Sequence, residues 1–275
     1  CMSSRFIGAL ERGVVVLDGA MGSTLQSLPL TVEGDYLGRE NCVDLLVRSR
    51  PELVQTIHES FLSVGSDAIE TNTFGANPLV LSEFDEEVVE WAFDLNRQAA
   101  EVARAACEVH ATAERPRFVV GSMGPGTKLV TLGQVSCATM LESYRVQAAG
   151  LLAGGVDAFL VETCQDLLQV KCAVNACLKA LEDVGKTALD IPILVTVTIE
   201  TTGTMLLGSE MAAAIAALSR YPIAALSRGL PLEGGCRRGG GFIWSDWEYR
   251  AASRSYCAVE AACSWRIRAL SARRT

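Results

Sequence analysis

The chain has 275 residues, of which 49% are hydrophobic, and a formal net charge of −8. This length allows one large domain with a substantial core, or two small domains. The acidic balance argues against nucleic acid or an anionic membrane surface as a general partner. No apolar run approaches the ~18 residues of a membrane span. Ten cysteines without a repeated spacing indicate reduced thiols in a cytoplasmic protein rather than disulfides.

Six short apolar runs each precede a polar or glycine-rich turn, and a helical pattern follows each turn. Continuous apolar runs of this kind are typical of parallel strands that are covered on both faces. In chain order the runs are residues 13–17, 67–70, 117–121, 157–161, 192–198 and 222–226.

Helical patterns lie between these runs. The stretch "SRPELVQTIHESFLSVG" has Pro51 in its first turn and Gly65 as a stop signal. Further helical patterns cover residues 86–110, 136–155, 166–185 and 209–220. Ser209 is the predicted N-cap of the last of these helices.

The alternation of strands and helices predicts βαβ units and a parallel sheet. A doubly wound sheet would concentrate its functional residues at one switch point, whereas a barrel gathers them from several strand ends. Here distinctive turns follow almost every strand, as "DGAMGS", "TNTFGAN", "SMGPGTK", "ETCQD" and "TIETTG". The sequence therefore predicts a (β/α)8 TIM barrel, of which six βα units are recognisable.

Four of these turns, taken in order, resemble the pattern of one family. They are "LDGAMGSTLQ", "IETNTFGAN", "GSMGPGTKL" and "VETCQDLLQVKCAV". They resemble the homocysteine S-methyltransferases, and most closely the homocysteine-binding domain of cobalamin-dependent methionine synthase. The resemblance extends over residues 12–226 and implies a (β/α)8 barrel that transfers a methyl group to the sulfur of homocysteine, giving methionine.

The resemblance also implies where the substrate binds. Asp18 and Glu162 would hold its ammonium group, and backbone N–H groups of the turn at residues 19–22 would hold its carboxylate, because glycine lets the main chain approach a ligand closely. Residues 70–73 would line the mouth beside it. The substrate-binding residues implied in this way are Asp18, Gly19, Ala20, Met21, Gly22, Glu70, Thr71, Asn72, Thr73 and Glu162.

Each of these residues also has a structural interpretation. Asp18 could cap the turn after the first strand, and Glu162 could be an acid favoured by the dipole of the next helix. The "ETNTFGAN" stretch could be ordinary loop chemistry. His58 lies beside apolar neighbours in its helix and is interpreted as structural. Cys164 is interpreted as a small filler residue.

The family further implies a zinc ion held by three Cys, which keeps the substrate thiol ionised, and methylcobalamin carried by another domain. The family pattern places these Cys in "G-[LIV]-N-C" after strand six and "G-G-C-C-G" after strand eight, and neither is matched here. Gly234–Gly235–Cys236 resembles the second, but it follows strand six by about ten residues and continues with Arg237. No metal ligand is therefore assigned, Cys236 included.

The composition changes near residue 227. Residues 227–275 contain nine Arg, no Lys, four acidic residues and three of the four Trp, and they show no strand–helix alternation. We therefore expect an incomplete barrel in residues 1–226, with unpaired edges on the first and sixth strands. We expect residues 227–275 to lie outside the native barrel, as the product of a frameshift or a wrongly assigned gene end.

Three functions remain open from the sequence. The first is the N-terminal, homocysteine-methylating part of cobalamin-dependent methionine synthase. The second is a stand-alone homocysteine methyltransferase that uses betaine or S-methylmethionine. The third is a non-catalytic fragment that keeps the substrate-binding turns without the zinc site. The expected partners are homocysteine and a methyl donor, with no nucleic acid and no membrane.

Overall fold

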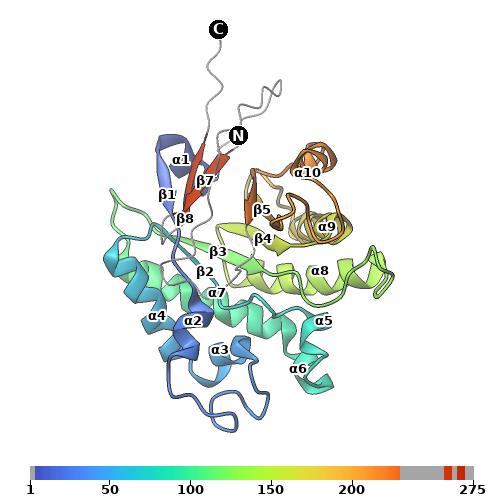
Figure 1. Cartoon of the computed structure of the whole chain (residues 1–275). Helices are drawn as coiled ribbons and strands as arrows, with labels where there is room; N and C mark the ends of the chain where they lie inside the picture. Colours follow the sequence, from blue (N-terminus) through green and yellow to red (C-terminus); the bar gives the residue numbers. More distant parts are fainter. Residues whose placement is uncertain (1–3, 230–256, 262–264, 270–275) are drawn as a thin grey trace.

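The computed structural model describes residues 4–229, 257–261 and 265–269. Their strands form a single sheet of eight, with helices packed around its outside (Figure 1). The strands are β1 Val14–Val16, β2 Ala68–Glu70, β3 Phe118–Met123, β4 Ala158–Cys164, β5 Ile193–Thr198, β6 Ala225–Gly229, β7 Cys257–Ala261 and β8 Trp265–Ala269. The helices are α1 Arg5–Arg12, α2 Met21–Gln26, η1 Val43–Leu45, α3 Leu46–Ser49, α4 Pro51–Val64, α5 Pro78–Leu81, α6 Glu86–Glu90, α7 Ala92–His110, α8 Cys137–Ala153, α9 Leu167–Asp183 and α10 Met211–Leu218.

The sheet has the order β1-β8-β7-β6-β5-β4-β3-β2 and closes on itself. Neighbours from β2 to β6 pair in parallel and in sequence order. A parallel bridge between Leu17 and Ala68 joins the end of β1 to β2. The predicted α/β barrel is confirmed, and all six predicted strands are present.

The prediction of unpaired edges on the first and sixth strands was wrong. β7 pairs in parallel with β6, and β8 pairs antiparallel with both β7 and β1. A strand edge has free backbone N–H and C=O groups. An extended segment can form hydrogen bonds with them regardless of its own side-chain pattern. The antiparallel β8 departs from the all-parallel barrel. The boundary at residue 227 stays a prediction, although β6 continues to Gly229.

The helix signals were largely read correctly. α4 begins at Pro51 and ends at Gly65, whose φ of 116° is left-handed. The prediction of Ser209 as the N-cap of α10 was wrong, because the cap is Glu210, without a side-chain hydrogen bond. Residue 209 is instead held by the loop before it: the Met205 N–H donates to the Ser209 carbonyl at 2.7 Å. The helix therefore starts later.

Two layers of apolar residues lie on the two sides of the sheet. Inside the barrel, Ala158 and Leu160 of β4 belong to a cluster that α1 closes with Phe6 and Leu10. The Phe6 ring meets the Phe118 ring edge-on, with centroids 5.4 Å apart. Because α1 fills this end of the barrel, the opposite end, at the carboxyl ends of the strands, remains for a site.

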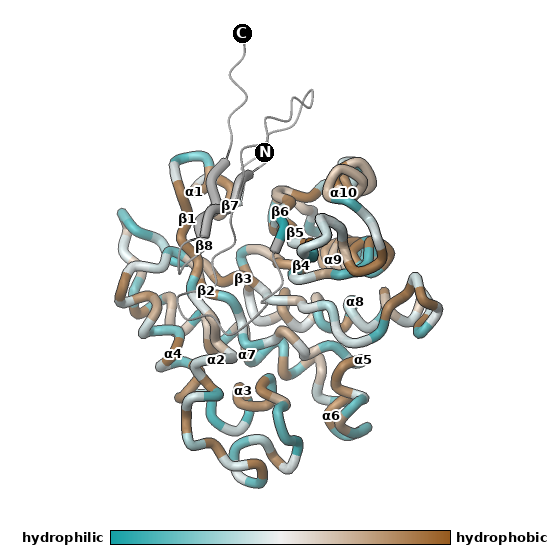
Figure 2. The backbone as a smooth tube through the Cα atoms, viewed as in Figure 1, coloured by the Kyte–Doolittle hydropathy of each residue, from teal (hydrophilic) through white to brown (hydrophobic). Residues whose placement is uncertain are grey.

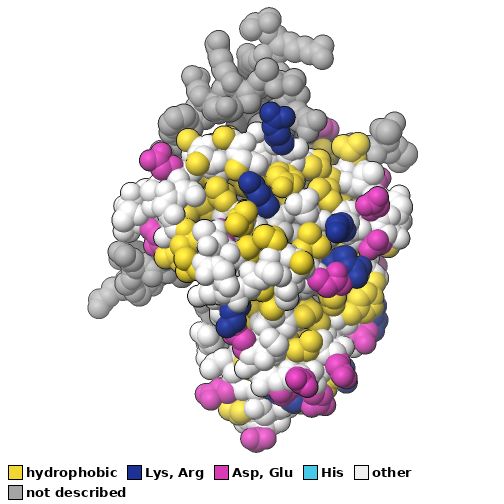
Figure 3. Space-filling view, turned by 90° about the vertical axis from the view of Figure 1, so that its right-hand side faces the viewer, with side chains coloured by type: hydrophobic (Ala, Val, Ile, Leu, Met, Phe, Trp, Pro, Cys, Tyr) yellow, Lys and Arg dark blue, Asp and Glu magenta, His cyan; other side chains and the backbone are white. Residues whose placement is uncertain are grey.

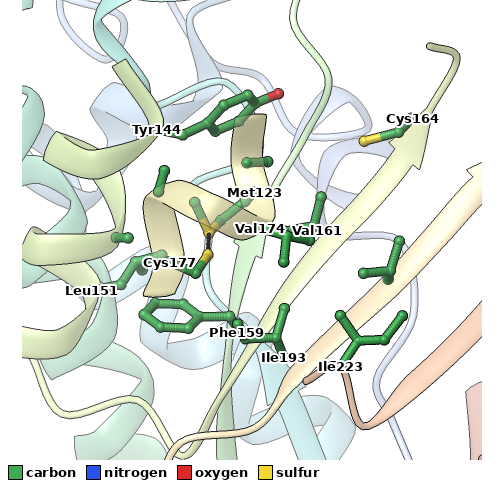
Figure 4. Packing of buried hydrophobic residues seen from close by; sticks show 14 of the residues in the cluster. Met123, Tyr144, Leu151, Phe159, Val161, Cys164, Val174, Cys177, Ile193 and Ile223 are labelled. Carbon is green, nitrogen blue, oxygen red and sulfur yellow. Dashed lines mark hydrogen bonds between the residues drawn. The ribbon is translucent and has the colours of Figure 1, made fainter. Parts of the chain in front are cut away.

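Outside the barrel, the alternate residues of β4 face the helices. Phe159 and Val161 pack with residues of α8 and α9 in the largest cluster (Figure 4). In the same view the Cys177 thiol lies 3.6 Å from the Met123 sulfur. Hydrophobic and hydrophilic stretches alternate along the outer helices (Figure 2), as expected where one helix face covers a sheet.

The surface carries the acidity of the composition. Acidic side chains gather toward the lower end of the face shown in Figure 3. Among the described residues, no helix is long and apolar enough to cross a lipid bilayer.

Candidate functional site

Three acidic residues from three strands meet at the carboxyl-end mouth of the barrel. Asp18 follows β1 and is 2% exposed, while Glu162 lies in β4 and is 7% exposed. Glu70 is the last residue of β2, and its Oε1 atom is buried. The charge of Glu162 acts on both Asp18 and Glu70. The structure thus brings together the two predicted ammonium-binding acids and Glu70, which was predicted to line the mouth beside them.

One oxygen of Asp18 is held by the neighbouring strand, while the other is free of hydrogen bonds. The Glu70 N–H donates to Asp18 Oδ1 at 3.0 Å. Within the described residues, Asp18 Oδ2 and Glu70 Oε1 are buried and have no hydrogen-bond partner. Buried polar atoms are rarely left in this state, because the unmade hydrogen bond costs about 1–3 kcal/mol. The arrangement leaves two carboxylate oxygens available to a ligand.

Glu162 is turned into the mouth by an irregularity in β4. The register of β4 against β5 shifts between Val161 and Cys164, and Thr163 has a φ of 59°. A left-handed φ is unfavourable for a β-branched residue and is found mainly where function requires it. The Thr163 N–H donates to Thr196 Oγ1 at 2.8 Å, which holds this bend to β5.

The Ser122 hydroxyl also holds the Glu162 side chain in place, through a hydrogen bond. Ser122 is in β3, and its Oγ donates to Glu162 Oε1 at 2.5 Å. Ser122 is itself fixed, because its N–H donates to Thr71 Oγ1 at 3.0 Å. Glu162 is therefore held by strands on either side of its own, with Ser122 in β3 and Thr196 in β5.

The electrostatics of the three acids favour a cation. Burial raises the pKa of Glu162 to about 7. Burial also raises the pKa of Asp18 and of Glu70, and the neighbouring Glu162 charge adds to both shifts. Three acids in one buried space disfavour each other's ionisation. A positively charged ligand would relieve this repulsion and would satisfy the free oxygens.

The described residues provide no cation of their own to these acids. Each Lys or Arg ion pair in this part of the chain involves another carboxylate. The nearest basic group is His58 of α4, whose Nδ1 lies 4.0 Å from Asp18 Oδ2. Burial lowers the pKa of His58 to about 4, so its imidazole is neutral at physiological pH.

The predicted carboxylate-binding turn lies directly beside Asp18. Ala20 is the N-cap of α2 and makes no side-chain hydrogen bond, and α2 begins at Met21. A Cβ atom added at Gly22 would meet nothing within 4 Å. There is therefore open space beside Gly22, as close approach of a ligand to the main chain requires. The roles of Gly19, Ala20, Met21 and Gly22 stay predictions.

The other predicted mouth residues are engaged within the protein. The Thr71 and Thr73 hydroxyls lie 2.6 Å apart, and the Thr73 hydroxyl donates to the Ser122 carbonyl at 2.7 Å. Asn72 Nδ2 donates to the Val43 carbonyl at 2.8 Å. All three side chains support the loop and the strand ends. Their role in substrate binding also stays a prediction.

Some residues around these acids carried no functional signal in the sequence. His58 was interpreted as structural, because a buried helix face does not show which strand end it meets. Ser122 lies within the quoted "GSMGPGTKL" motif but carried no signal of its own. Thr163 and Thr196 are common residue types, and only the register shift of β4 gives them a role. The spacing of four residues between Val54, His58 and Leu62, which are all buried, was the one sequence signal that His58 lies on the buried face of its helix.

The described residues do not form a zinc site. They contain no group of three or more His, Cys, Asp and Glu side chains placed to hold a metal. Cys164 is the one cysteine at the mouth beside Glu162; it is buried, and burial raises the pKa of its thiol, which disfavours the thiolate that zinc requires. Cys236 lies outside the described residues.

Known proteins share both the sequence and the fold. A family model described as "Homocysteine S-methyltransferase" matches residues 15–230. Methionine synthase from Mycobacterium tuberculosis (strain ATCC 25618 / H37Rv) is 45% identical over 212 residues, which cover 77% of this chain and 17% of that protein. Methionine synthase from Mycobacterium leprae (strain TN) is 46% identical over 209 residues, covering 76% and 17%. The chain thus spans about a sixth of the length of these relatives.

Solved structures of the Escherichia coli homocysteine methyltransferase MmuM have the same fold. The metallated form superposes with a TM-score of 0.61 at 19% identity, over 82% of this chain and 77% of that one. The oxidized form gives a TM-score of 0.60 at 20% identity, over 78% and 73%. The likeness at this identity concerns the fold alone. Because the family model covers most of the barrel, the chain belongs to the homocysteine S-methyltransferase family.

Proposed function

We propose that this chain binds homocysteine at the mouth of the barrel and forms the homocysteine-methylating part of a longer protein of the methionine synthase type. The observation that carries the proposal is the group of three buried acids, which have two oxygens without a hydrogen bond and no Lys or Arg partner among the described residues. Homocysteine brings one ammonium group, which matches this need. Asp18 and Glu162 would bind it, with Glu70 beside them.

The reaction requires the sulfur of homocysteine to attack a methyl group. A free thiol has a pKa of about 8.5, so the thiol must lose its proton for the sulfur to become a good nucleophile. The sulfur–methyl bond then forms as the bond between the donor and the methyl group breaks, and the donor keeps the electron pair. The acids would fix the amino-acid end of the substrate and so place the sulfur, which is how binding energy serves orientation.

The methyl donor would come from the rest of the longer protein. Support for this comes from the share of the relatives that this chain covers, 17% in both mycobacterial methionine synthases. Their remaining length leaves room for other domains, and the resemblance found in the sequence implies methylcobalamin as the donor. Zinc would have to be held by residues outside those described.

Isothermal titration of the purified chain with L-homocysteine tests the binding step. We expect L-homocysteine to bind. The affinity for 4-mercaptobutanoate, which lacks the amine, should be at least tenfold lower. E162Q and D18N should weaken homocysteine binding in the same way and leave the analogue unaffected. The matched control is D190N, which replaces an exposed acid in a loop far along the chain. Equal affinity for the two ligands would contradict the proposal.

Methyl transfer is tested separately from binding. The chain is supplied in turn with methylcobalamin, betaine and S-methylmethionine, and methionine is measured together with the zinc content. Methionine formed from methylcobalamin supports the methionine synthase type, and methionine from one of the small donors supports a stand-alone enzyme. Binding without zinc and without transfer supports the non-catalytic fragment.

A further inference from the structure

His58 is a buried polar side chain with no hydrogen bond in the part of the chain that the structure covers. It lies on the inner face of α4, is 0% exposed, and neither ring nitrogen has a partner. A neutral imidazole carries one N–H donor and one acceptor, and leaving a donor unpaired in the interior is costly. Apolar packing alone would be served better by Phe or Leu. His58 therefore lacks, among the described residues, the hydrogen-bond partner that a buried imidazole needs.

The nearest group able to fill this need is Asp18. His58 Nδ1 and Asp18 Oδ2 lie 4.0 Å apart, which is beyond hydrogen-bonding distance, and Oδ2 is also unpaired. The other oxygen, Oδ1, is already held by the Glu70 N–H at 3.0 Å. A small rotation of the carboxylate would close the gap to His58. Once the gap is closed, one hydrogen bond would satisfy both atoms, which have no other partner among the described residues.

Ligand binding supplies a reason for this hydrogen bond to form. Burial raises the pKa of Asp18 and the neighbouring Glu162 charge adds to this shift, so both disfavour the ionised carboxylate. The titratable groups around Asp18 are His58 from α4, Glu70 from β2, Glu162 from β4 and Cys107 from α7. An ammonium group favours the ionised carboxylate, which then needs donors on both oxygens. The Glu70 N–H serves one of them.

We infer that His58 is a positioning residue for Asp18, whose Nδ1–H donates to Oδ2 when a substrate ammonium binds. This inference rests on the proposed binding of an amino-acid substrate at Asp18 and goes beyond it by assigning the role of a residue in the surrounding helix. His58 does not touch the substrate. It acts by holding the carboxylate ionised and oriented.

Substitution of His58 tests the inference through ligand affinity and its pH dependence. H58F keeps the volume and removes the donor, whereas H58N keeps a donor near the place of Nδ1. We expect H58F to weaken L-homocysteine binding about tenfold or more, because hydrogen bonds to charged groups are among the stronger ones. H58N should recover most of this loss. Binding by H58F should also fail at higher pH than in the wild type as the pH is lowered, since Asp18 without its donor has a higher pKa.

A double-mutant cycle separates this role from a merely structural one. If His58 acts through Asp18, the effect of H58F on affinity should disappear in the D18N background. 4-Mercaptobutanoate, which has no amine, should bind the wild type and H58F equally well. A loss of affinity that is the same with and without D18N, or the same for both ligands, would overturn the inference while leaving the proposed function intact.

Nuclear magnetic resonance on the chain with His58 in place gives a second test that does not depend on the His58 variants folding. The chain has only two His, so H110A assigns the imidazole nitrogens of His58. We expect homocysteine to shift the His58 Nδ1 resonance in the direction of a hydrogen-bonded N–H, and the analogue without an amine to leave it unchanged. An unchanged Nδ1 resonance in a chain that binds homocysteine would refute the inference. A wild type that binds no homocysteine would overturn the proposed function and this inference with it.

Discussion

Replacing Glu162 by Gln should change how the stability of the unliganded chain depends on pH. Burial raises the pKa of this carboxyl from 4.5 to about 7, so the folded state holds its proton more tightly than the unfolded state does. The contribution of the protonated Glu162 to the free energy of unfolding is therefore fully present below pH 4.5 and is lost as the pH rises toward 7. A shift of this size corresponds to about 3 kcal/mol. Gln cannot ionise and should not show the loss.

Urea unfolding followed by circular dichroism between pH 4.5 and 8 measures this effect. At pH 4.5 E162Q and the wild type should have similar free energies of unfolding, because Gln keeps an acceptor for the Ser122 hydroxyl. By pH 8 the variant should be more stable by up to about 3 kcal/mol, although it binds homocysteine poorly. E182Q, at an exposed position of α9, is the control. A difference between E162Q and the wild type that does not change with pH would refute the reasoning.

Three further outcomes are expected. G150A should destabilise the chain by about 1–3 kcal/mol, because its Cβ would clash with the Phe93 carbonyl where α8 packs on α7. G8A, whose Cβ would have a nearest contact of 3.4 Å, should be neutral or slightly stabilising, since Ala is the better helix former. A melting temperature of G150A equal to that of the wild type would contradict this. T163G should raise stability by up to about 1 kcal/mol, because Gly accepts the left-handed φ, and should weaken homocysteine binding by freeing Glu162; a loss of stability would show that the bend is unstrained. Iodoacetamide mapped by mass spectrometry should label Cys137, which is exposed, well before Cys177, which is buried and whose thiol pKa burial raises; labelling at similar rates would show that this core opens readily.

The strands were predictable because each is a short apolar run between turn residues. Residues 157–161 predicted β4 as an apolar strand, and the structure has it from Ala158 to Cys164. The extension through Glu162 was not predictable, because it includes a register shift and a left-handed Thr163 that depend on pairing with β5. The turn residues predicted which end of the barrel holds the site, and the pairing of β4 with β5 decided how the Glu162 side chain is directed there.

The tail shows the limit of reasoning from pattern. Residues 227–275 carry no strand–helix alternation, yet β7 and β8 occupy the gap between β6 and β1. Almost every residue has a backbone N–H and C=O group, so an extended segment can pair with an open sheet edge even when its sequence has no alternating hydrophobic pattern. The same reason explains the late start of α10, where a bridge between Thr204 and Glu210 takes precedence over the capping preference of Ser209.

The sequence by itself determined the order of βα units, the family pattern of the turns and the two acids expected to hold an ammonium group. These are properties of local residue order, since apolar periods and turn residues act within a few positions of each other. Only the tertiary structure decided that the Glu70 N–H and His58 lie beside Asp18, that Ser122 holds Glu162, and that Thr196 holds the bend at Thr163. These contacts join positions as much as 52 residues apart, as between the Glu70 N–H and Asp18. They exist because closure of the sheet brings the strand ends together.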